Sequence, residues 1–212
     1  MLDAGCGSGR VTALLAERLL DGRVIALDGS TSMLETARRR LAPFGDRIRF
    51  VLADLMAPLP IDEPVDAVLS TATFHWVPDH DALFAHLAAV LRPGGRLVAQ
   101  CGGAGNLASV ARVLEELGAD PFTGKVFATP ERTAERLRTS GFVDVESWLH
   151  TEPTPFETLG ALETFLRTVA LGDHVKTMTD GEADAFAHAV AARLPRLELD
   201  YVRLNIDARL AG

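Results

Sequence analysis

The sequence is poor in the residues that build metal clusters, disulfide scaffolds and membrane spans. It has two cysteines, Cys6 and Cys101, which are too few for a cysteine-rich zinc site or an iron–sulfur cluster and which suit a reducing compartment. No apolar run approaches the roughly 20 residues that a membrane helix needs, and Met1 is not followed by the basic region of a signal peptide. These absences exclude radical chemistry on a three-cysteine cluster and predict a cytoplasmic protein with no membrane partner.

Positive charge is also scarce. The chain has 21 Lys and Arg residues against 29 Asp and Glu residues, a net charge of −8 at pH 7. Binding to nucleic acid relies on a basic surface that displaces counterions from the phosphates. The charge therefore predicts no nucleic-acid partner and favours a small-molecule one. At 212 residues and 48% hydrophobic content, the chain is expected to form a single globular domain rather than a disordered segment.

Short apolar runs alternate with helical patterns through the first two-thirds of the chain, which is typical of βα units and a mostly parallel sheet. A helix is expected over Asp79–Leu91, where Leu83, Leu87 and Val90 recur at helical spacing, and Arg92–Gly95 should end it. The expected strands, mostly buried on both faces, are Val24–Leu27, Ile48–Leu52, Ala67–Leu69 and Arg96–Ala99. The predicted fold class is α/β, a Rossmann-like doubly wound sheet.

The last third of the chain has a different pattern. Apolar and polar residues alternate over Val143–Glu146 and again over Val202–Asp207, which predicts two antiparallel strands at a sheet edge. Two helical stretches, about Leu159–Leu171 and Asp180–Leu194, lie between them. Because neither helix is needed to complete a sheet, we expect them to form a cap over whatever the sheet binds.

A glycine-rich loop leads from the end of a strand into a helical pattern. Gly5, Gly7 and Gly9 follow the strand, and a loop of this kind lets the backbone approach a ligand closely. The spacing differs from the dinucleotide fingerprint G-x-G-x-x-G, whose third glycine is replaced by Arg10, and no Gly-Lys-Ser/Thr of a phosphate-binding P-loop follows. The apolar face of the helix is expected to contain Val11, Leu14, Leu15, Arg18 and Leu19.

Two carboxylates follow later strands of the predicted sheet. Asp28 ends the second strand, roughly 20 residues after the loop, where a doubly wound fold uses an acid to bind ribose hydroxyls. Asp54 follows the third strand and could accept a hydrogen bond from an exocyclic adenine amine. Each aspartate alone is more often a turn or cap residue, but their order on successive strands favours a nucleoside site.

These residues, taken in order, resemble the motifs of class I S-adenosylmethionine-dependent methyltransferases. The segments that carry the resemblance are Asp3–Gly9, Asp28–Leu34, Ala53-Asp54, Asp66–Ser70 and Leu91–Gly95. Thr73–His80 and Ser140–Val145 are similar to segments of the trans-aconitate methyltransferases and their relatives. The resemblance implies a seven-stranded sheet with an antiparallel last strand, a helical cap, and S-adenosyl-L-methionine as cofactor.

The resemblance also implies roles for individual residues. Asp3 and the loop of Gly5, Cys6, Gly7 and Gly9 would hold the methionine end of the cofactor. Asp28 with Gly29 would take the ribose, while Met33, Asp54 and Leu55 would frame the adenine. Ser70 and Thr71 would lie near the sulfonium methyl. For Met33 an ordinary core position is an equal alternative from periodicity alone.

The expected reaction is in-line methyl transfer to a small-molecule acceptor, by O-methylation of a carboxylate or hydroxyl. A carboxylate is ionised at neutral pH and needs no general base, whereas a hydroxyl does. His75 is the candidate base, although His75 and Trp76 could instead wall the pocket. His80 with Asp79 and Asp81 could be interpreted as metal ligands, but acids and polar residues are common at a helix start, so no metal is expected.

An anionic acceptor would need cations nearby. Those available in the last third of the chain are Arg167, Lys176, Arg193 and Arg203, and they could equally be solvated. The Arg38–Arg40 run is interpreted as a solvated helix face. The segment after the fourth strand, Ser70–Thr73, lacks the Asn-Pro-Pro-Tyr element usual in base-modifying nucleic-acid methyltransferases.

The expected layout is a single domain over 1–212, with a cofactor-binding core at 1–150, a helical cap insertion at 151–196 and the last strand at 197–210. Family members usually carry N-terminal helices and the first half of strand one before the glycine loop. Here those helices are missing, which leads to the hypothesis that Met1 is a mis-called start. The alternatives are a cofactor-binding protein of the same fold without methyl transfer and an NAD-dependent oxidoreductase.

Overall fold

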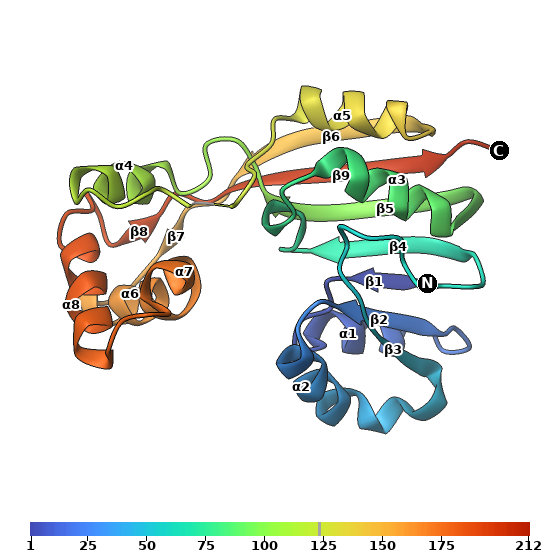
Figure 1. Ribbon diagram of the computed structural model, residues 1–212, viewed down its shortest axis with the longest axis horizontal. Coiled ribbons are helices and arrows are strands. Elements are labelled where there is room, and N and C mark those ends of the chain that lie inside the picture. The colour runs from blue at the N-terminus through green and yellow to red at the C-terminus, as the bar shows by residue number, and fades with distance from the viewer. Residues whose placement is uncertain (123) are drawn as a thin grey trace. The chain divides into compact units, whose positions relative to one another are not determined.

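The computed structural model of the chain describes residues 1–122 and 124–212 (Figure 1). These residues form two compact units, which are described separately. The first unit comprises 1–104, 126–150 and 203–212, and the second comprises 105–125 and 151–202. The second unit therefore includes a segment near residue 110 as well as the predicted cap region.

The first unit is built on a seven-stranded sheet of order β3-β2-β1-β4-β5-β9-β6. Its strands are β1 (Leu2–Ala4), β2 (Val24–Asp28), β3 (Ile48–Leu52), β4 (Val65–Thr71), β5 (Leu91–Gly102), β6 (Phe142–Thr151) and β9 (Val202–Leu210). The pairs β1–β2, β1–β4, β2–β3 and β4–β5 are parallel, and β9 is antiparallel to β5. Because β1 is central and the chain winds outward from it in both directions, the doubly wound, mostly parallel fold is confirmed.

Three α-helices of the first unit begin at side-chain caps that the sequence supplies, whereas the helix that follows Gly9 has none. Ser30 accepts a hydrogen bond from the Met33 backbone N–H, and Asp79 caps the next long helix in the same way. The helices are α1 (Arg10–Arg18), α2 (Thr31–Leu41), α3 (His80–Val90) and α5 (Pro130–Thr139), with short 3-10 turns η1 (Ala42–Arg47) and η2 (Phe74–Trp76).

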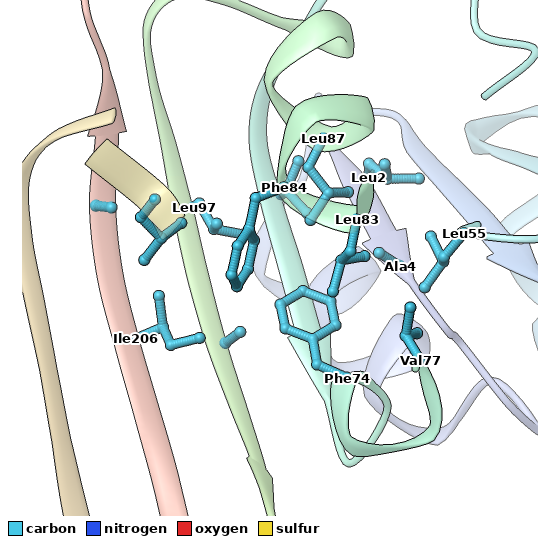
Figure 2. Packing of buried hydrophobic residues seen from close by; sticks show 14 of the residues in the cluster. Leu2, Ala4, Leu55, Phe74, Val77, Leu83, Phe84, Leu87, Leu97 and Ile206 are labelled. Atoms are coloured by element: carbon cyan, nitrogen blue, oxygen red, sulfur yellow. The ribbon is translucent and has the colours of Figure 1, made fainter. Parts of the chain in front are cut away.

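Apolar residues form one cluster on each face of the sheet. Along β2, Val24 and Ala26 belong to a cluster with α1 and α2, whereas Leu27 belongs to the other. Figure 2 shows part of the cluster that contains Leu27, in which Phe84 of α3 lies next to Phe74 of the η2 turn. Burial on both faces explains the continuous apolar run of β2, whereas β3, at the edge of the sheet, exposes Arg49 and Leu52 and is not buried on both faces as expected.

The second unit is mostly helical. Asp200 accepts hydrogen bonds from the backbone N–H and side chain of Ser109, and Arg167 forms ion pairs with Asp180 and Asp184. Its elements are α4 (Ala108–Glu116), β7 (Thr154–Pro155), α6 (Leu159–Phe165), the π-helical turn η3 (Leu166–Ala170), α7 (Gly172–Val175), α8 (Asp180–Ala191) and β8 (Glu198–Leu199). The predicted helix over Leu159–Leu171 is thus divided between α6 and η3. Helix α4 was not predicted.

Two predictions about exposure are wrong. Leu14 is 49% exposed, and α1 instead buries Thr12 and Ala16, because small side chains allow the helix to lie close to the sheet. Strand β9 is not at the edge, since it lies between β5 and β6. Its alternating pattern arises because every second residue enters the core while the others are half-buried. No helix in the described part of the chain is both long enough and apolar enough to cross a membrane.

The burial of the core predicts that two leucines contribute very differently to the free energy of unfolding. Leu87 on α3 is fully buried, whereas Leu20 is 78% exposed. Leu87→Ala should lower the free energy of unfolding by about 2–5 kcal/mol because it leaves a cavity. Leu20→Ala should change it by less than about 0.5 kcal/mol. Urea denaturation of both variants measures the difference, and equal losses would contradict this description of the core.

Candidate functional site

A cavity of about 590 Å³ opens at the carboxyl ends of the parallel strands. This is the place where doubly wound sheets bind ligands, because the chain leaves β1 and its neighbours in opposite directions there. The walls come from the loop after β1, the segments that follow β2 and β3, and the segment between β4 and α3. The lining residues are Gly5–Ser8, Arg10, Val11, Leu27–Ser30, Met33, Ala53–Leu55, Thr71–Thr73, Trp76 and Val77.

The glycine loop is held against β2. The backbone N–H groups of Gly5 and Cys6 both donate to the Leu27 carbonyl at 2.8 Å. Gly5 has φ +81°, and a Cβ there would lie 2.2 Å from the Thr73 side chain, so the position requires glycine. At Gly7, with φ +53°, a Cβ would meet no atom within 4 Å, which leaves its backbone open to a ligand.

Asp28 organises the loop as well as the cavity. Its carboxylate accepts hydrogen bonds from the backbone N–H groups of Gly7 and Ser30, both at 2.8 Å. Each carboxylate oxygen has a further lone pair. The half-buried Asp28 can therefore hold the loop and still accept hydroxyl groups from a ligand.

Asp3 lies beneath the loop rather than on the cavity wall. The carboxylate is completely buried, and Oδ2 accepts a hydrogen bond from Thr12 Oγ1 at 2.6 Å, while Oδ1 has no partner. Burial raises the pKa of Asp3 to about 6, and the nearby charge of Asp28 adds to this. Burial also raises the pKa of the Cys6 thiol to about 12, so this cysteine is protonated at neutral pH.

The side of the cavity formed after β2 and β3 carries Met33 and Asp54. Met33 is 46% exposed, which agrees with a ligand-facing position better than with an ordinary core one. Asp54 Oδ1 accepts a hydrogen bond from the Met56 backbone N–H at 2.9 Å, while Leu55 is buried against the core. A polar oxygen and two apolar side chains at one opening can hold a flat polar ring.

The segment after β4 forms the opposite side. Thr71 lines the cavity, but Ser70 is buried and its hydroxyl donates to the Ala4 carbonyl at 2.7 Å, joining β4 to β1. Thr73 Oγ1 bonds to the carbonyls of Gly5 and Thr71 at 3.2 and 3.0 Å. The sequence motif gave no signal for Thr73 as a lining residue, because this contact depends on the neighbouring strand.

His75 is next to the cavity lining but not part of it. Its Nδ1 accepts a hydrogen bond from the Gly102 backbone N–H at 3.2 Å, and its ring stacks on Phe127 at 5.9 Å. In the neutral ring, Nε2 then carries the hydrogen. Nε2 therefore presents a donor, and a proton could be accepted there only after the Gly102 bond breaks.

Most of the predicted cofactor residues surround this cavity. Those that line it are Gly5, Cys6, Gly7, Asp28, Gly29, Met33, Asp54, Leu55 and Thr71, and those that do not are Asp3, Gly9 and Ser70; the candidate base His75 does not line it either. Gly9 has φ +78°, and a Cβ there would lie 3.0 Å from Leu41, so it allows close packing of α1 and α2. Within residues 1–122 and 124–212, no group of three or more His, Cys, Asp and Glu residues could hold a metal ion.

Among the residues that the structure describes, Arg10 is the one cation on the lining, and the sequence did not indicate it. Throughout the described chain, its guanidinium makes no hydrogen bond or ion pair. Arg40 lies nearby and is held by the carbonyl and hydroxyl of Ser8, both at 2.7 Å. Three of the cations proposed from the sequence are engaged within the second unit: Arg167 by Asp180 and Asp184, Lys176 by Asp173, and Arg193 by the Ala189 carbonyl.

Comparison with known proteins relates the chain to methyltransferases. A family model described as a methyltransferase domain matches residues 1–95. The trans-aconitate 2-methyltransferase of Variovorax paradoxus is 41% identical over 100 residues, which cover 47% of this chain and 37% of that protein. The trans-aconitate 2-methyltransferase of Delftia acidovorans is 29% identical over 198 residues, covering 85% of this chain and 72% of that protein. The match to the Variovorax protein thus spans less than two-fifths of its length.

A solved structure has the same fold. Phosphoethanolamine N-methyltransferase 2 of Haemonchus contortus, in complex with phosphomonomethylethanolamine and S-adenosylhomocysteine, superposes with a TM-score of 0.66 at 21% identity. The match covers 100% of this chain and 48% of that chain. At this identity the likeness shows a shared fold.

The buried Asp3 predicts a dependence of stability on pH. Its pKa is raised from 3.8 to about 6 on folding, so between these values the folded protein holds a proton that the unfolded chain has released. The stability present in acid is therefore lost as the pH rises through 6. A pKa difference of this size corresponds to about 3 kcal/mol. Asp3→Asn removes the ionisable group, so we expect it to be about 1–3 kcal/mol more stable than wild type at pH 7.

Urea denaturation of wild type and Asp3→Asn at several pH values measures this effect. The difference between the two proteins should shrink as the pH falls toward 4, because Asp3 is then neutral in the folded protein. A difference that does not vary with pH, or one that grows in acid, would contradict the assignment.

Proposed function

Because this chain belongs to the class I S-adenosylmethionine-dependent methyltransferases and is related to the trans-aconitate methyltransferases, we propose that it transfers a methyl group to a small carboxylate. The observation that carries the proposal is the cavity at the carboxyl ends of the parallel strands. There the glycine loop and the carboxylates of Asp28 and Asp54 lie on successive strands, together with an unpaired Arg10.

The residues of the cavity fit S-adenosylmethionine in three respects. Asp28 keeps unused lone pairs for the ribose hydroxyls, and the backbone at Gly7 is open. The buried Oδ1 of Asp3 lacks a partner beneath the loop, so this carboxylate adds uncompensated negative charge near the place proposed for the methionine ammonium. Met33 and Asp54 would frame the adenine from the other side.

When bound, the cofactor supplies a methyl group already activated on its sulfonium. The protein's task is then to hold an attacking oxygen in line, about 3 Å from the methyl carbon, and to exclude water. Thr71, Thr73 and Trp76 wall the cavity at the end of β4, where we propose that the acceptor arrives. An ionised carboxylate can attack without losing a proton, so no residue has to act as a base.

This choice of acceptor assigns His75 a limited role. With Nδ1 held by the Gly102 N–H, the neutral ring offers a donor at Nε2. His75 is the candidate catalytic residue. It is required as a base only if the acceptor is a hydroxyl, phenol or carbon acid. His75→Asn, which keeps an acceptor near Nδ1, separates the two cases, because transfer to a carboxylate should survive it.

The cofactor site is tested by calorimetry with S-adenosylmethionine. Asp28→Ala should weaken binding by about 1–3 kcal/mol, because it removes charge-assisted hydrogen bonds to ligand and loop. Asp62→Ala, at an exposed position outside the cavity lining, is the matched control and should bind like wild type. Unchanged affinity in Asp28→Ala would show that this carboxylate is not a cofactor ligand.

Activity is then assayed by transfer of labelled methyl from S-adenosylmethionine to trans-aconitate and other small carboxylates, with phenols as the comparison. Binding without transfer to any acceptor would favour the alternative of a cofactor-binding protein. A fluorescence titration with NADH tests the oxidoreductase alternative, which the proposed function predicts will show no binding.

The position of Arg10 on the cavity lining predicts that the methyl acceptor is negatively charged. As the unpaired cation on the lining, it should pair with a carboxylate of the acceptor. Arg10→Gln is expected to raise the KM of an active carboxylate acceptor by about 10–100-fold, because a charged hydrogen bond is lost. Arg39→Gln, at an exposed position on α2, is the control and should leave the KM unchanged.

Two further ligands locate the carboxylate that Arg10 binds. S-adenosylhomocysteine carries the amino-acid carboxylate, whereas 5′-methylthioadenosine lacks it. If Arg10→Gln weakens the binding of S-adenosylhomocysteine but not that of 5′-methylthioadenosine, Arg10 binds the carboxylate of the cofactor instead of that of the acceptor. If neither ligand nor the acceptor KM responds, Arg10 is not a binding residue.

A further inference from the structure

The η2 turn, which lies between β4 and α3, carries part of the cavity wall, and its His75 carbonyl accepts a hydrogen bond from the Val126 backbone N–H at 2.8 Å. Within the turn, Trp76 N–H donates to the Thr73 carbonyl at 2.8 Å and Val77 N–H to the Phe74 carbonyl at 3.0 Å. The segment enters the turn through Ala72, whose φ of +55° is unfavourable for a residue with a Cβ. Since Thr73, Trp76 and Val77 line the cavity, its shape depends on what holds this turn.

His80 contacts the turn from the first residue of α3. Its Nε2 lies 2.9 Å from the Phe74 carbonyl oxygen, and a carbonyl can only accept, so Nε2 carries the hydrogen. The ring is 2% exposed and packs edge-on against Phe84 at 5.8 Å. Phe84 in turn packs edge-on against Phe74 at 6.0 Å, as Figure 2 shows for the two phenylalanines. Phe74 of the turn is thus held by one hydrogen bond from His80 and one ring contact with Phe84, and the His80 ring supports Phe84 in turn.

Two alternative roles for His80 are capping of α3 and metal binding, and the structure supports neither. Asp79 already caps α3 by accepting hydrogen bonds from the Asp81 and Ala82 N–H groups at 2.9 and 3.0 Å. His80 belongs to no potential metal-binding group among the described residues. Of the two ring nitrogens of His80, Nε2 has a hydrogen-bond partner, and this partner belongs to the turn.

We propose that His80 is a positioning residue, whose Nε2–H bond to the Phe74 carbonyl holds η2 so that Thr73 and Trp76 keep their places in the cavity wall. For its effect on catalysis this role rests on the proposed function. The position of the turn can be measured without any ligand, so failure of His80 and failure of the proposed function are distinguishable.

The surroundings of His80 make its hydrogen bond to the turn depend on pH. Burial lowers the pKa of His80 below its ordinary value of 6.5, and Arg136 of α5 acts in the same direction, while Asp79 and Asp81 oppose it. Arg136 Nε lies 3.4 Å from an Asp81 carboxylate oxygen. Protonation would add an N–H at Nδ1, which is buried without a partner, so in acid the ring should leave its place and release the turn.

The experiment uses Trp76 as a reporter on the turn. Trp148 is the second tryptophan of the chain and lies half-exposed on β6, so Trp148→Phe leaves Trp76 alone. In this background, Trp76 emission and its quenching by iodide are followed from pH 8 to pH 5. Variants at the test position are His80→Gln, whose amide can still donate to the Phe74 carbonyl, and His80→Leu, which cannot.

Two histidine controls separate other causes of a change in emission. His150→Gln removes an exposed histidine of β6. His75→Asn removes the ring 5.4 Å from Trp76, whose protonation could itself quench emission. The acid transition assigned to His80 should remain in both controls.

We expect the parent protein to show a transition in Trp76 emission below pH 6.5 that is absent from His80→Gln. His80→Leu should alter emission and quenching already at pH 8. In assays with an active acceptor it should raise the KM by about 2–12-fold with little change in kcat, and His80→Gln should restore the KM.

Native emission at pH 8 in His80→Leu, or an acid transition that persists in both His80 variants, would overturn the proposal. If His80→Leu does not fold, ¹⁵N NMR of His80 in the parent protein at pH 8 decides the question. A protonated Nε2 with an unprotonated Nδ1 supports the hydrogen bond to Phe74, and the opposite tautomer overturns it.

Discussion

The attachment of the glycine loop to the end of β2 is the constraint on which the site depends. Leu27 provides a carbonyl for two loop N–H groups, and Asp28 provides a carboxylate for a third at Gly7. The loop can adopt this path because Gly5 tolerates a positive φ and leaves room for Thr73. Two neighbouring parallel strands are thereby coupled at their carboxyl ends, and the loop forms one wall of the cavity.

The carboxylate of Asp3, buried beneath the glycine loop, has an electrostatic cost for the stability of the folded protein. Asp3 is buried without a partner for Oδ1, and its raised pKa shows that the folded protein resists holding the charge. A carboxylate kept in such a place contributes little to stability and is better suited to attract a positive group. The proposed methionine ammonium is such a group, which connects the unfavourable burial of Asp3 with binding.

The opposite wall depends on the core rather than on the loop. Phe74 is buried between the sheet and α3, while the residues on either side of it reach the cavity or its border. Packing around Phe84 and the hydrogen bond from His80 therefore act on the wall through Phe74. A change in the core of α3 can in this way alter the site without touching a ligand.

The sequence by itself determined the doubly wound fold and many of the residues that line the cavity. Glycines with positive φ and acids at strand ends are local requirements, so Gly5, Gly7 and Asp28 can be recognised from residue type and spacing. Tertiary structure decided which side chains are buried and which meet across strands. It placed Ser70 and Asp3 behind the wall and exposed Leu14, because burial depends on how closely an element lies against its neighbours. It also brought Arg10 to the cavity and His80 to the turn, since contacts between separate elements have no signature in local sequence.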